Sequence, residues 1–246
     1  MSTVLHGMAE VYKASPAKGT SINVRYLSIK RLLDLVLATL MLLLTAPFIL
    51  ISMLLVRLTS RGPMIYAQKR LGQEGRTFTI YKIRTMYHNC EVLTGPRWAS
   101  ARDPRVTPVG RFLRATHLDE LPQLWNVLRG DMSLVGPRPE RPEFIPALEQ
   151  DIPHYRQRLE VRPGLTGLAQ VQLPADTDLD SVRRKLAHDL YYIERLGPWL
   201  DLRLLAGTAL YALGLPFSVA ARLLRVPHGE EVEGEGRAAE DARCAA

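Results

Sequence analysis

The sequence predicts an α+β protein in which a membrane-inserted N-terminal helix precedes a compact mixed helical domain with a small β-hairpin and amphipathic interfacial helices. Three observations predict this fold class. A long apolar run near the N-terminus carries no charge, two β-rich segments flank a pair of glycines, and the remainder shows helix-start signals and helical periodicity.

Composition divides the chain into five segments: a polar start (1–29), a membrane helix (30–57), the main domain (58–200), an amphipathic interfacial segment (201–226) and an acidic tail (227–246). The tail holds few large apolar residues, so we expect it to be disordered. The tail is acidic, whereas the rest of the chain is basic. The whole chain carries a net charge of +7, and because the tail contributes −4, the remainder carries +11.

A body this basic suits phosphate-rich partners, which include nucleic acid, anionic lipid and nucleotide substrates. We exclude nucleic acid because the cations cluster around the apolar run and no aromatic-basic recognition motif is present. The two cysteines, Cys90 and Cys244, lack metal-site spacing and predict neither a disulfide framework nor a zinc site.

The apolar run extends from Leu35 to Val56 and is long enough, at ~1.5 Å per helical residue, to cross the ~30 Å hydrocarbon core. A single spanning helix is the reading that hydropathy favours. Pro47 lies near the middle, however, where it removes a backbone hydrogen bond and kinks a helix. Basic residues also flank both ends, which suits a re-entrant helix that bends at Pro47 and returns to the same face. The sequence leaves both topologies open.

The next two segments, Met64 to Ala67 and Thr77 to Ile83, predict a hairpin with Gly72 and Gly75 in its turn. On the second strand one face carries Phe78, Ile80, Lys82 and Arg84. Two aligned cations beside an apolar anchor could bind a diphosphate, although a solvated strand end explains them equally well.

A helix is predicted from Thr107 and Pro108, with Phe112 and Leu113 on its buried side. It leads into the adjacent carboxylates Asp119 and Glu120, which precede Pro122. Such a pair is usually surface charge. Here a proline break can re-aim the side chains, and two arginines lie close in sequence, Arg114 and, in the stiff turn VGPRPE, Arg138. A carboxylate near cations is a known arrangement for phosphoryl transfer.

Two later segments complete the organisation. Residues 180 to 195 read as a helix with one apolar side. A second uncharged run, from Leu204 to Ala221, is broken by Gly214 and Pro216. We read it as an interfacial segment, and a buried helix of the soluble core is the competing reading.

The motifs KRLLDLVLATLMLLLTAPF, KIRTM, DPRVTPVGRFLRATHLDELPQLWNVLRGDMSLVGPRP and RPGLTGLAQV, in that order, resemble the bacterial sugar transferases. These are monotopic polyprenyl-phosphate phosphoglycosyl transferases, and this chain is similar to their minimal single-domain form. The resemblance covers about Lys30 to Ala212 and implies that segment 58–200 is the catalytic domain. It also makes the re-entrant helix the leading reading, because Pro47 matches the proline that turns the family's membrane helix.

The resemblance implies transfer of a phospho-sugar from a nucleotide diphosphate sugar, with UDP expected, to undecaprenyl phosphate with release of UMP. Asp119 matches the nucleophile, which forms a covalent aspartyl intermediate near Mg²⁺, and Glu120 matches its partner. The phosphate-binding positions of the family correspond to Arg114, Arg138, Lys82 and Arg84.

The implied location is the bacterial inner membrane, with the catalytic domain on the cytoplasmic face. There the enzyme would begin exopolysaccharide, capsule, O-antigen or glycoconjugate synthesis, with later glycosyltransferases as possible partners. A catalytically inactive membrane-anchored scaffold is the alternative. One departure, Gln172-Leu173-Pro174 in place of the family's usual Asn-Gly-Arg, leaves the nucleotide sugar open. The sequence also leaves open the pathway, the oligomeric state and the role of the tail.

Overall fold

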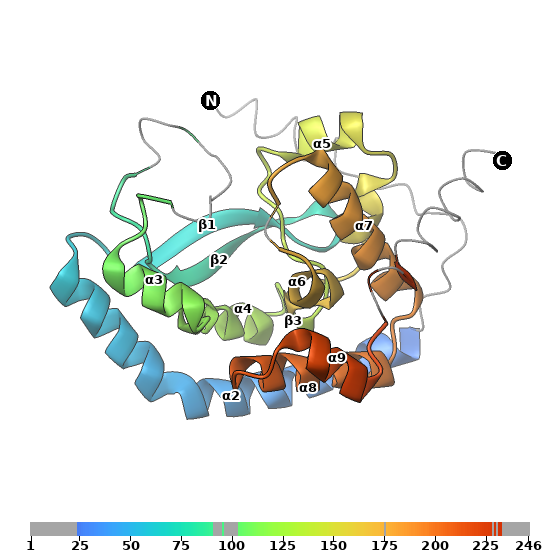
Figure 1. Ribbon diagram of the computed structural model, residues 1–246, viewed down its shortest axis with the longest axis horizontal. Coiled ribbons are helices and arrows are strands. Elements are labelled where there is room, and N and C mark those ends of the chain that lie inside the picture. The colour runs from blue at the N-terminus through green and yellow to red at the C-terminus, as the bar shows by residue number, and fades with distance from the viewer. Residues whose placement is uncertain are drawn as a thin grey trace.

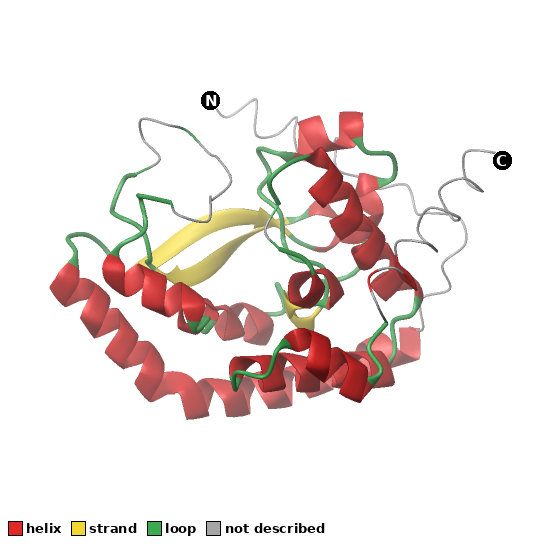
Figure 2. Cartoon of the chain, in the orientation of Figure 1, coloured by secondary structure: helices red, strands yellow, loops and turns green. Residues whose placement is uncertain are grey.

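The structure is a computed structural model that describes residues 24–90, 95, 103–174, 176–227, 229 and 231–232. Most of the expected polar start and acidic tail lies outside the described residues. Helices make up most of the described chain, and a two-stranded hairpin crosses the middle of the domain (Figure 2). The mixture of helices with small sheets confirms the expected α+β class.

The N-terminal helix α2 (Val24–Thr59) contains Pro47 and bends along its course beneath the rest of the domain (Figure 1). Within the described chain it is the one helix long and apolar enough to cross a membrane, with a mean hydropathy of 2.5 in its most apolar window. Only 11% of that window is buried, which argues against a core helix. Its exposed apolar residues are Ile29, Leu32, Leu33, Val36, Leu37, Leu40, Met41, Leu43, Leu44, Phe48, Leu50, Ile51, Leu54, Leu55 and Leu58.

Polar contacts fasten the first half of α2 to the domain. The buried carboxylate of Asp201 accepts hydrogen bonds from the Tyr26 hydroxyl (2.6 Å) and the Tyr192 hydroxyl (2.7 Å), and it pairs with the Lys30 ammonium at 2.5 Å. One turn on, Asp34 accepts from the Leu134 backbone N–H at 3.1 Å. A buried carboxylate with three donors is satisfied, so this end of α2 is held in one place.

The basic residues at the two ends of α2 differ in their surroundings. Lys30 is buried against Asp201, and Arg31 donates to the carbonyls of Val127 (2.6 Å) and Leu128 (2.9 Å). Both cations precede the apolar run, and their contacts dock α2 against the domain. Arg57 and Arg61, at the other end, are exposed.

The hairpin pairs β1 (Ile65–Leu71) with β2 (Thr77–Ile83) in antiparallel register, and the 3₁₀ turn η1 (Gln73–Gly75) joins them. This confirms the predicted hairpin and lengthens its first strand. Asn126 links the hairpin to the helices: it donates to the Thr79 carbonyl (2.7 Å) and accepts from the Tyr81 N–H (3.2 Å). The buried Asn126 amide thus holds β2 in one position relative to the helix that carries Asn126.

Helix α3 (Pro108–Ala115) begins as predicted, because the Thr107 side chain accepts from the Gly110 N–H at 2.9 Å. Leu113 is buried, but Phe112 is 57% exposed, which corrects its expected burial. The helix then ends before the carboxylate pair. His117 adopts a left-handed conformation (φ 55°), and the pair lies in the 3₁₀ turn η2 (Leu118–Glu120). Pro122 precedes α4 (Gln123–Arg129), which ends at Gly130.

A second pairing lies beyond α4. Strand β3 (Ser133–Val135) runs parallel to β4 (Gly164–Thr166), and the backbones approach closely at Gly136 and Gly164. A side chain at either glycine would collide with the other segment's backbone. The helical elements here are α5 (Ile145–Asp151), η3 (Tyr155–Leu159), α6 (Leu168–Gln172) and α7 (Leu179–Glu194), and α7 confirms the helix expected at 180–195.

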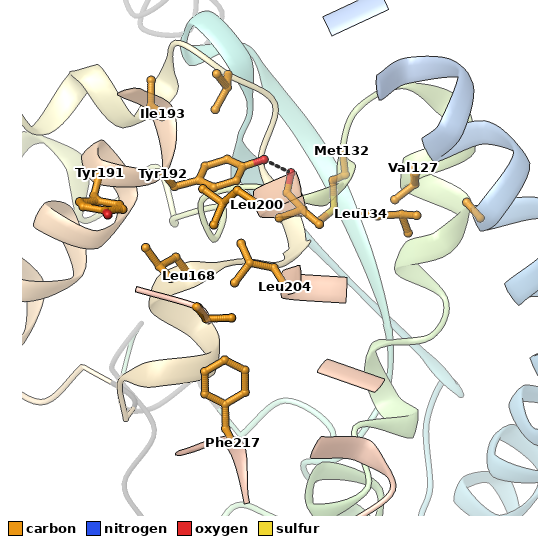
Figure 3. Close-up of a cluster of buried hydrophobic side chains, with 14 of the residues drawn as sticks. Val127, Met132, Leu134, Leu168, Tyr191, Tyr192, Ile193, Leu200, Leu204 and Phe217 are labelled. Atoms are coloured by element: carbon orange, nitrogen blue, oxygen red, sulfur yellow. Dashed lines mark hydrogen bonds between the residues drawn. The ribbon is translucent and has the colours of Figure 1, made fainter. Parts of the chain in front are cut away.

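Helices α8 (Pro198–Ala212) and α9 (Phe217–Leu224) lie on the α2 side of the domain (Figure 1). They pack into the main core through Leu200, Leu204 and Phe217, which surround Leu168 and Tyr192 (Figure 3). Inside this cluster the Tyr192 hydroxyl donates to the Val135 carbonyl at 3.1 Å.

The outer side of the same two helices is apolar, with exposed Trp199, Leu202, Tyr211, Leu213, Val219 and Leu223. Both readings of the second uncharged run are thus partly right, because one side is core and the other is a large apolar surface. Helix α8 also runs across the boundary expected at residue 200.

Candidate active site

The carboxylate pair lies on η2, at the junction of three elements. The left-handed His117 ends the preceding helical turn, so the chain turns sharply before Asp119 and Glu120. Asp119 is 6% exposed, and Glu120 is half-buried. Carboxylates are seldom buried without compensating partners, so the surroundings of this pair decide its chemistry.

Glu120 is held by two cations from distant parts of the sequence. One of its oxygens, Oε1, accepts a hydrogen bond from Lys82 Nζ at 2.7 Å and another from Arg138 Nη2 at 2.8 Å. Lys82 comes from β2, and Arg138 comes from the turn after β3. The structure therefore brings three of the predicted site residues into direct contact.

The pKa values of the two carboxyl groups are shifted in opposite directions. Burial raises the pKa of Asp119 to about 6, and the neighbouring negative charge of Glu120 adds to that rise. Burial alone would also raise the pKa of Glu120, but the Arg138 and Lys82 cations overcome it and hold that pKa well below its usual range. Glu120 is thus an anion throughout the neutral pH range, whereas Asp119 gains or loses its proton near pH 6.

Arg114 and His117 belong to the surroundings of Asp119. The Arg114 guanidinium donates through Nε to Thr85 Oγ1 at 2.9 Å. The positive charges of Lys82, Arg114 and His117 each lower the pKa of Asp119 and so limit the rise that burial causes. Within the described chain no group donates a hydrogen bond to the Asp119 carboxylate, so its oxygens are not held by another side chain.

Two predicted residues lie in other contacts. The buried Arg84 donates through Nη2 to the Ser60 carbonyl and the Ser60 hydroxyl (both 2.8 Å), and through Nη1 to the Arg61 carbonyl. Ser60 and Arg61 directly follow Thr59, the last residue of α2, so Arg84 ties the end of this helix to β2. Its expected part in phosphate binding stays a prediction without a contact here. Pro47 lies inside α2.

Sequence reasoning missed two residues that shape the site. His117 supplies the left-handed turn before Asp119, and its place two residues before that carboxylate was the available signal. Asn126 aligns β2 and thereby Lys82, but a polar residue in an amphipathic helix gives no signal of that role.

The described residues contain no cluster of three or more His, Cys, Asp or Glu side chains that could hold a metal ion by themselves. Mg²⁺ does not need such a cluster, because it commonly takes one or two carboxylates, water and substrate phosphates. Asp119, whose carboxylate has no competing donor among the described residues, fits that requirement, whereas Glu120 is occupied by two cations.

The structure thus combines a long apolar helix, compatible with membrane insertion, with a carboxylate pair flanked by cations. The chain belongs to the bacterial sugar transferase family, whose model matches residues 25–214. The match confirms the resemblance seen in the sequence motifs.

Curated relatives agree with this assignment. The chain is 44% identical over 176 residues to the UDP-N-acetylgalactosamine-undecaprenyl-phosphate N-acetylgalactosaminephosphotransferase of Aeromonas hydrophila, covering 72% of this chain and 41% of that protein. It is 46% identical over 183 residues to the UDP-glucose:undecaprenyl-phosphate glucose-1-phosphate transferase of Caulobacter vibrioides, covering 73% and 67%. The exopolysaccharide production protein PSS of Rhizobium leguminosarum is 39% identical over 192 residues, covering 76% and 96%. The chain thus spans less than half of the Aeromonas relative.

The opposed pKa values predict opposite effects of neutralising the two carboxylates. The raised pKa of Asp119 means that its ionised form destabilises the fold above about pH 6 and that this cost disappears as the pH falls toward 4. We expect Asp119→Asn to raise the free energy of unfolding at pH 7.5 by up to about 3 kcal/mol. The gain over the parent should vanish near pH 4, as measured by denaturant unfolding in detergent.

The matched control is Glu120→Gln, which leaves Lys82 and Arg138 without their shared anion. We expect it to lower the free energy of unfolding at pH 7.5 by about 3 kcal/mol. Equal effects of the two substitutions would contradict the opposed electrostatics of the pair.

Proposed function

We propose that the protein transfers a phospho-sugar from a UDP-sugar to undecaprenyl phosphate and releases UMP. The observation that carries the proposal is the unequal carboxylate pair. Glu120 is fixed as an anion between Lys82 and Arg138, and the adjacent Asp119 has no hydrogen-bond donor within the described residues. The names of the relatives support UDP-sugars as donors and undecaprenyl phosphate as the acceptor.

In the first step, an oxygen of Asp119 attacks the sugar-bearing phosphorus of the donor. An acyl–phosphate bond forms, the bond from that phosphorus to the bridging oxygen breaks, and UMP leaves with both electrons of the broken bond. The pKa of about 6 leaves most of Asp119 ionised at neutral pH, as a nucleophile requires. We infer that Arg138 and Lys82, whose ion pairs with Glu120 lie next to Asp119 in the chain, bind the donor's phosphates.

In the second step, an oxygen of the lipid phosphate attacks the same phosphorus. The acyl–phosphate bond breaks and the Asp119 carboxylate is restored, so one phosphoanhydride replaces another. Glu120 keeps Lys82 and Arg138 oriented through both steps, because its hydrogen bonds to them do not involve the reacting atoms. We do not assign Glu120 to proton transfer with the incoming lipid phosphate. Its low pKa makes it a poor proton carrier near neutral pH.

Mg²⁺ is part of the proposal, with Asp119 as the ligand that the chain supplies. When bound, the ion would neutralise the diphosphate and so reduce its repulsion of an anionic nucleophile. The remaining ligands would come from the donor's phosphates and water.

We further propose that α2 is re-entrant and enters the membrane from the cytoplasmic face of the bacterial inner membrane. Two contacts support this. One end of α2 is held through Lys30 and Asp201, and the other end through the carbonyls that Arg84 binds. A straight spanning helix would put its ends on opposite sides of the bilayer, where one domain could not hold both. The bend of α2 (Figure 1) and the exposed apolar side of α8 and α9 fit the same placement.

The proposed product is a polyprenyl-linked sugar, so enzymes that extend it would act next, as in exopolysaccharide, capsule, O-antigen or glycoconjugate synthesis. The inactive scaffold remains the alternative, but a scaffold has no need of a carboxylate pair set among the cations of Lys82, Arg114 and Arg138.

The function is tested by UMP release from UDP-glucose and UDP-N-acetylgalactosamine in the presence of undecaprenyl phosphate and Mg²⁺. We expect the parent to release UMP and Asp119→Asn to lower the rate at least ~10³-fold, because the nucleophile is lost while its size is kept. Asp180→Asn, which alters an exposed ion pair with Arg183, is the control and should match the parent. Undiminished turnover by Asp119→Asn would refute the mechanism.

The topology is tested with single cysteines at two exposed positions, Ser28 and Arg61, in a chain whose Cys90 and Cys244 are replaced by Ser. An impermeant maleimide is applied to sealed vesicles of known orientation. We expect both cysteines to react only in inside-out vesicles, because both ends of α2 face the cytoplasm. Reaction of the two positions in vesicles of opposite orientation would establish a spanning helix.

A further inference from the structure

The turn that carries Arg138 is held by an unusually complete set of backbone contacts. Four consecutive carbonyls, those of residues 137–140, each accept a hydrogen bond. Backbone N–H groups serve the first and the last: Gly164 donates to Pro137 at 2.8 Å, and Leu71 donates to Glu140 at 3.0 Å. The carbonyls of Arg138 and Pro139 accept hydrogen bonds from arginine side chains.

These arginines come from opposite sides of the turn. Arg70, on β1, donates through Nη1 to the Pro139 carbonyl at 3.2 Å. Arg158, on η3, donates through Nη2 to the carbonyl of Arg138 itself at 2.9 Å. The contact of Arg158 therefore fixes the peptide group of the residue whose guanidinium reaches Glu120 at 2.8 Å.

Arg158 is held in turn by fixed partners. Its side chain is 2% exposed. Its Nε and Nη2 lie 3.0 and 2.7 Å from Asp189 Oδ2 on α7, and its Nη1 donates to the Tyr155 hydroxyl at 2.7 Å. All three guanidinium nitrogens thus have partners, so the side chain has little freedom to re-aim.

Burying a guanidinium and a carboxylate is expensive, and apolar side chains of similar size often stabilise a fold as well or better. A stabilising role alone therefore does not explain the pair. Its distinctive contact is the Arg138 carbonyl, because among the described residues Arg158 is the side chain whose hydrogen bonds join that carbonyl to Asp189 of α7. A rigid support of this kind is what a phosphate-binding arginine needs to keep its geometry as charge moves.

We propose that Arg158, oriented by Asp189, is a positioning residue that sets the Arg138 guanidinium for phosphate binding. Arg158 acts through Arg138 and does not itself touch the substrate. The inference rests on the proposed function, in which Arg138 binds the donor's phosphates. It adds a second set of residues, on η3 and α7, to the requirements of the site.

The test is a double-mutant cycle between Arg158→Lys and Arg138→Lys, two substitutions that keep the charges. It is measured on the dissociation constant for UDP and on kcat/KM for UMP release. In the parent background we expect Arg158→Lys to weaken UDP binding and to lower kcat/KM by about tenfold each, because lysine cannot hold both Asp189 and the Arg138 carbonyl in a fixed fork. In the Arg138→Lys background we expect less than a twofold effect.

Asp189→Asn is the second variant, since it disturbs Arg158 without changing its side chain, and it should show the same coupling to Arg138. Arg183→Lys, at an exposed position on α7, is the matched control and should leave both quantities unchanged. All variants are compared at equal folded fraction, established by thermal unfolding.

The outcomes separate the two proposals. Equal losses from Arg158→Lys in both backgrounds would mean a general structural role and would overturn the positioning role. A parent that binds UDP but releases no UMP would refute the proposed function, and the cycle on UDP binding would still decide how Arg158 acts.

Discussion

One carboxylate oxygen ties the site together. Oε1 of Glu120 accepts from both Lys82 and Arg138, and so joins the hairpin, the η2 turn and the turn after β3 at a single point. A half-buried anion between two cations is stable only if all three remain in place. The arrangement therefore fixes the cations at the site and keeps Glu120 ionised. Its neighbour Asp119 accepts no hydrogen bond from the described residues, so its carboxylate is the one left to bind a substrate or a metal ion.

Satisfied polar groups also connect the site to the long apolar helix α2. Asp201 holds the first half of α2, and Arg84 holds the last turn. Between these points α2 exposes an apolar surface, and α8 and α9 expose another on the same side of the domain. A bilayer that covers these surfaces would place η2 close to the headgroups, where a lipid phosphate emerges while its chain stays in the membrane.

Local signals in the sequence predicted the elements well. The glycine turn of the hairpin, the Thr107 cap of α3 and the apolar side of α7 all depend on residues near one another in the chain, and the structure confirms them. The contact of Lys82 and Arg138 with Glu120 was not predicted, because spacing alone cannot bring segments so far apart together and the family resemblance implied only that both residues bind phosphate. The contacts that were missed join partners that are distant in sequence. The contacts of Lys30 with Asp201 and of Arg31 with the α4 carbonyls could not be foreseen.

Phe112 shows a related limit, since a helical period marks an apolar side without saying whether protein or lipid covers it. Arg84 could likewise be aligned with Lys82 on the strand, but its grip on the end of α2 appears only in three dimensions. Arg158 gave no signal, because an arginine destined for burial looks in sequence like one destined for the surface.

The proposed covalent role of Asp119 is tested directly by mass spectrometry of the quenched enzyme. The protein is incubated with Mg²⁺ and the accepted UDP-sugar, without polyprenyl phosphate, and then digested with trypsin. We expect a phospho-sugar on the peptide 115–129, which contains Asp119, together with an equivalent amount of released UMP. An enzyme that turns over fully when the lipid is added, yet never carries this modification on that peptide, would contradict the covalent role.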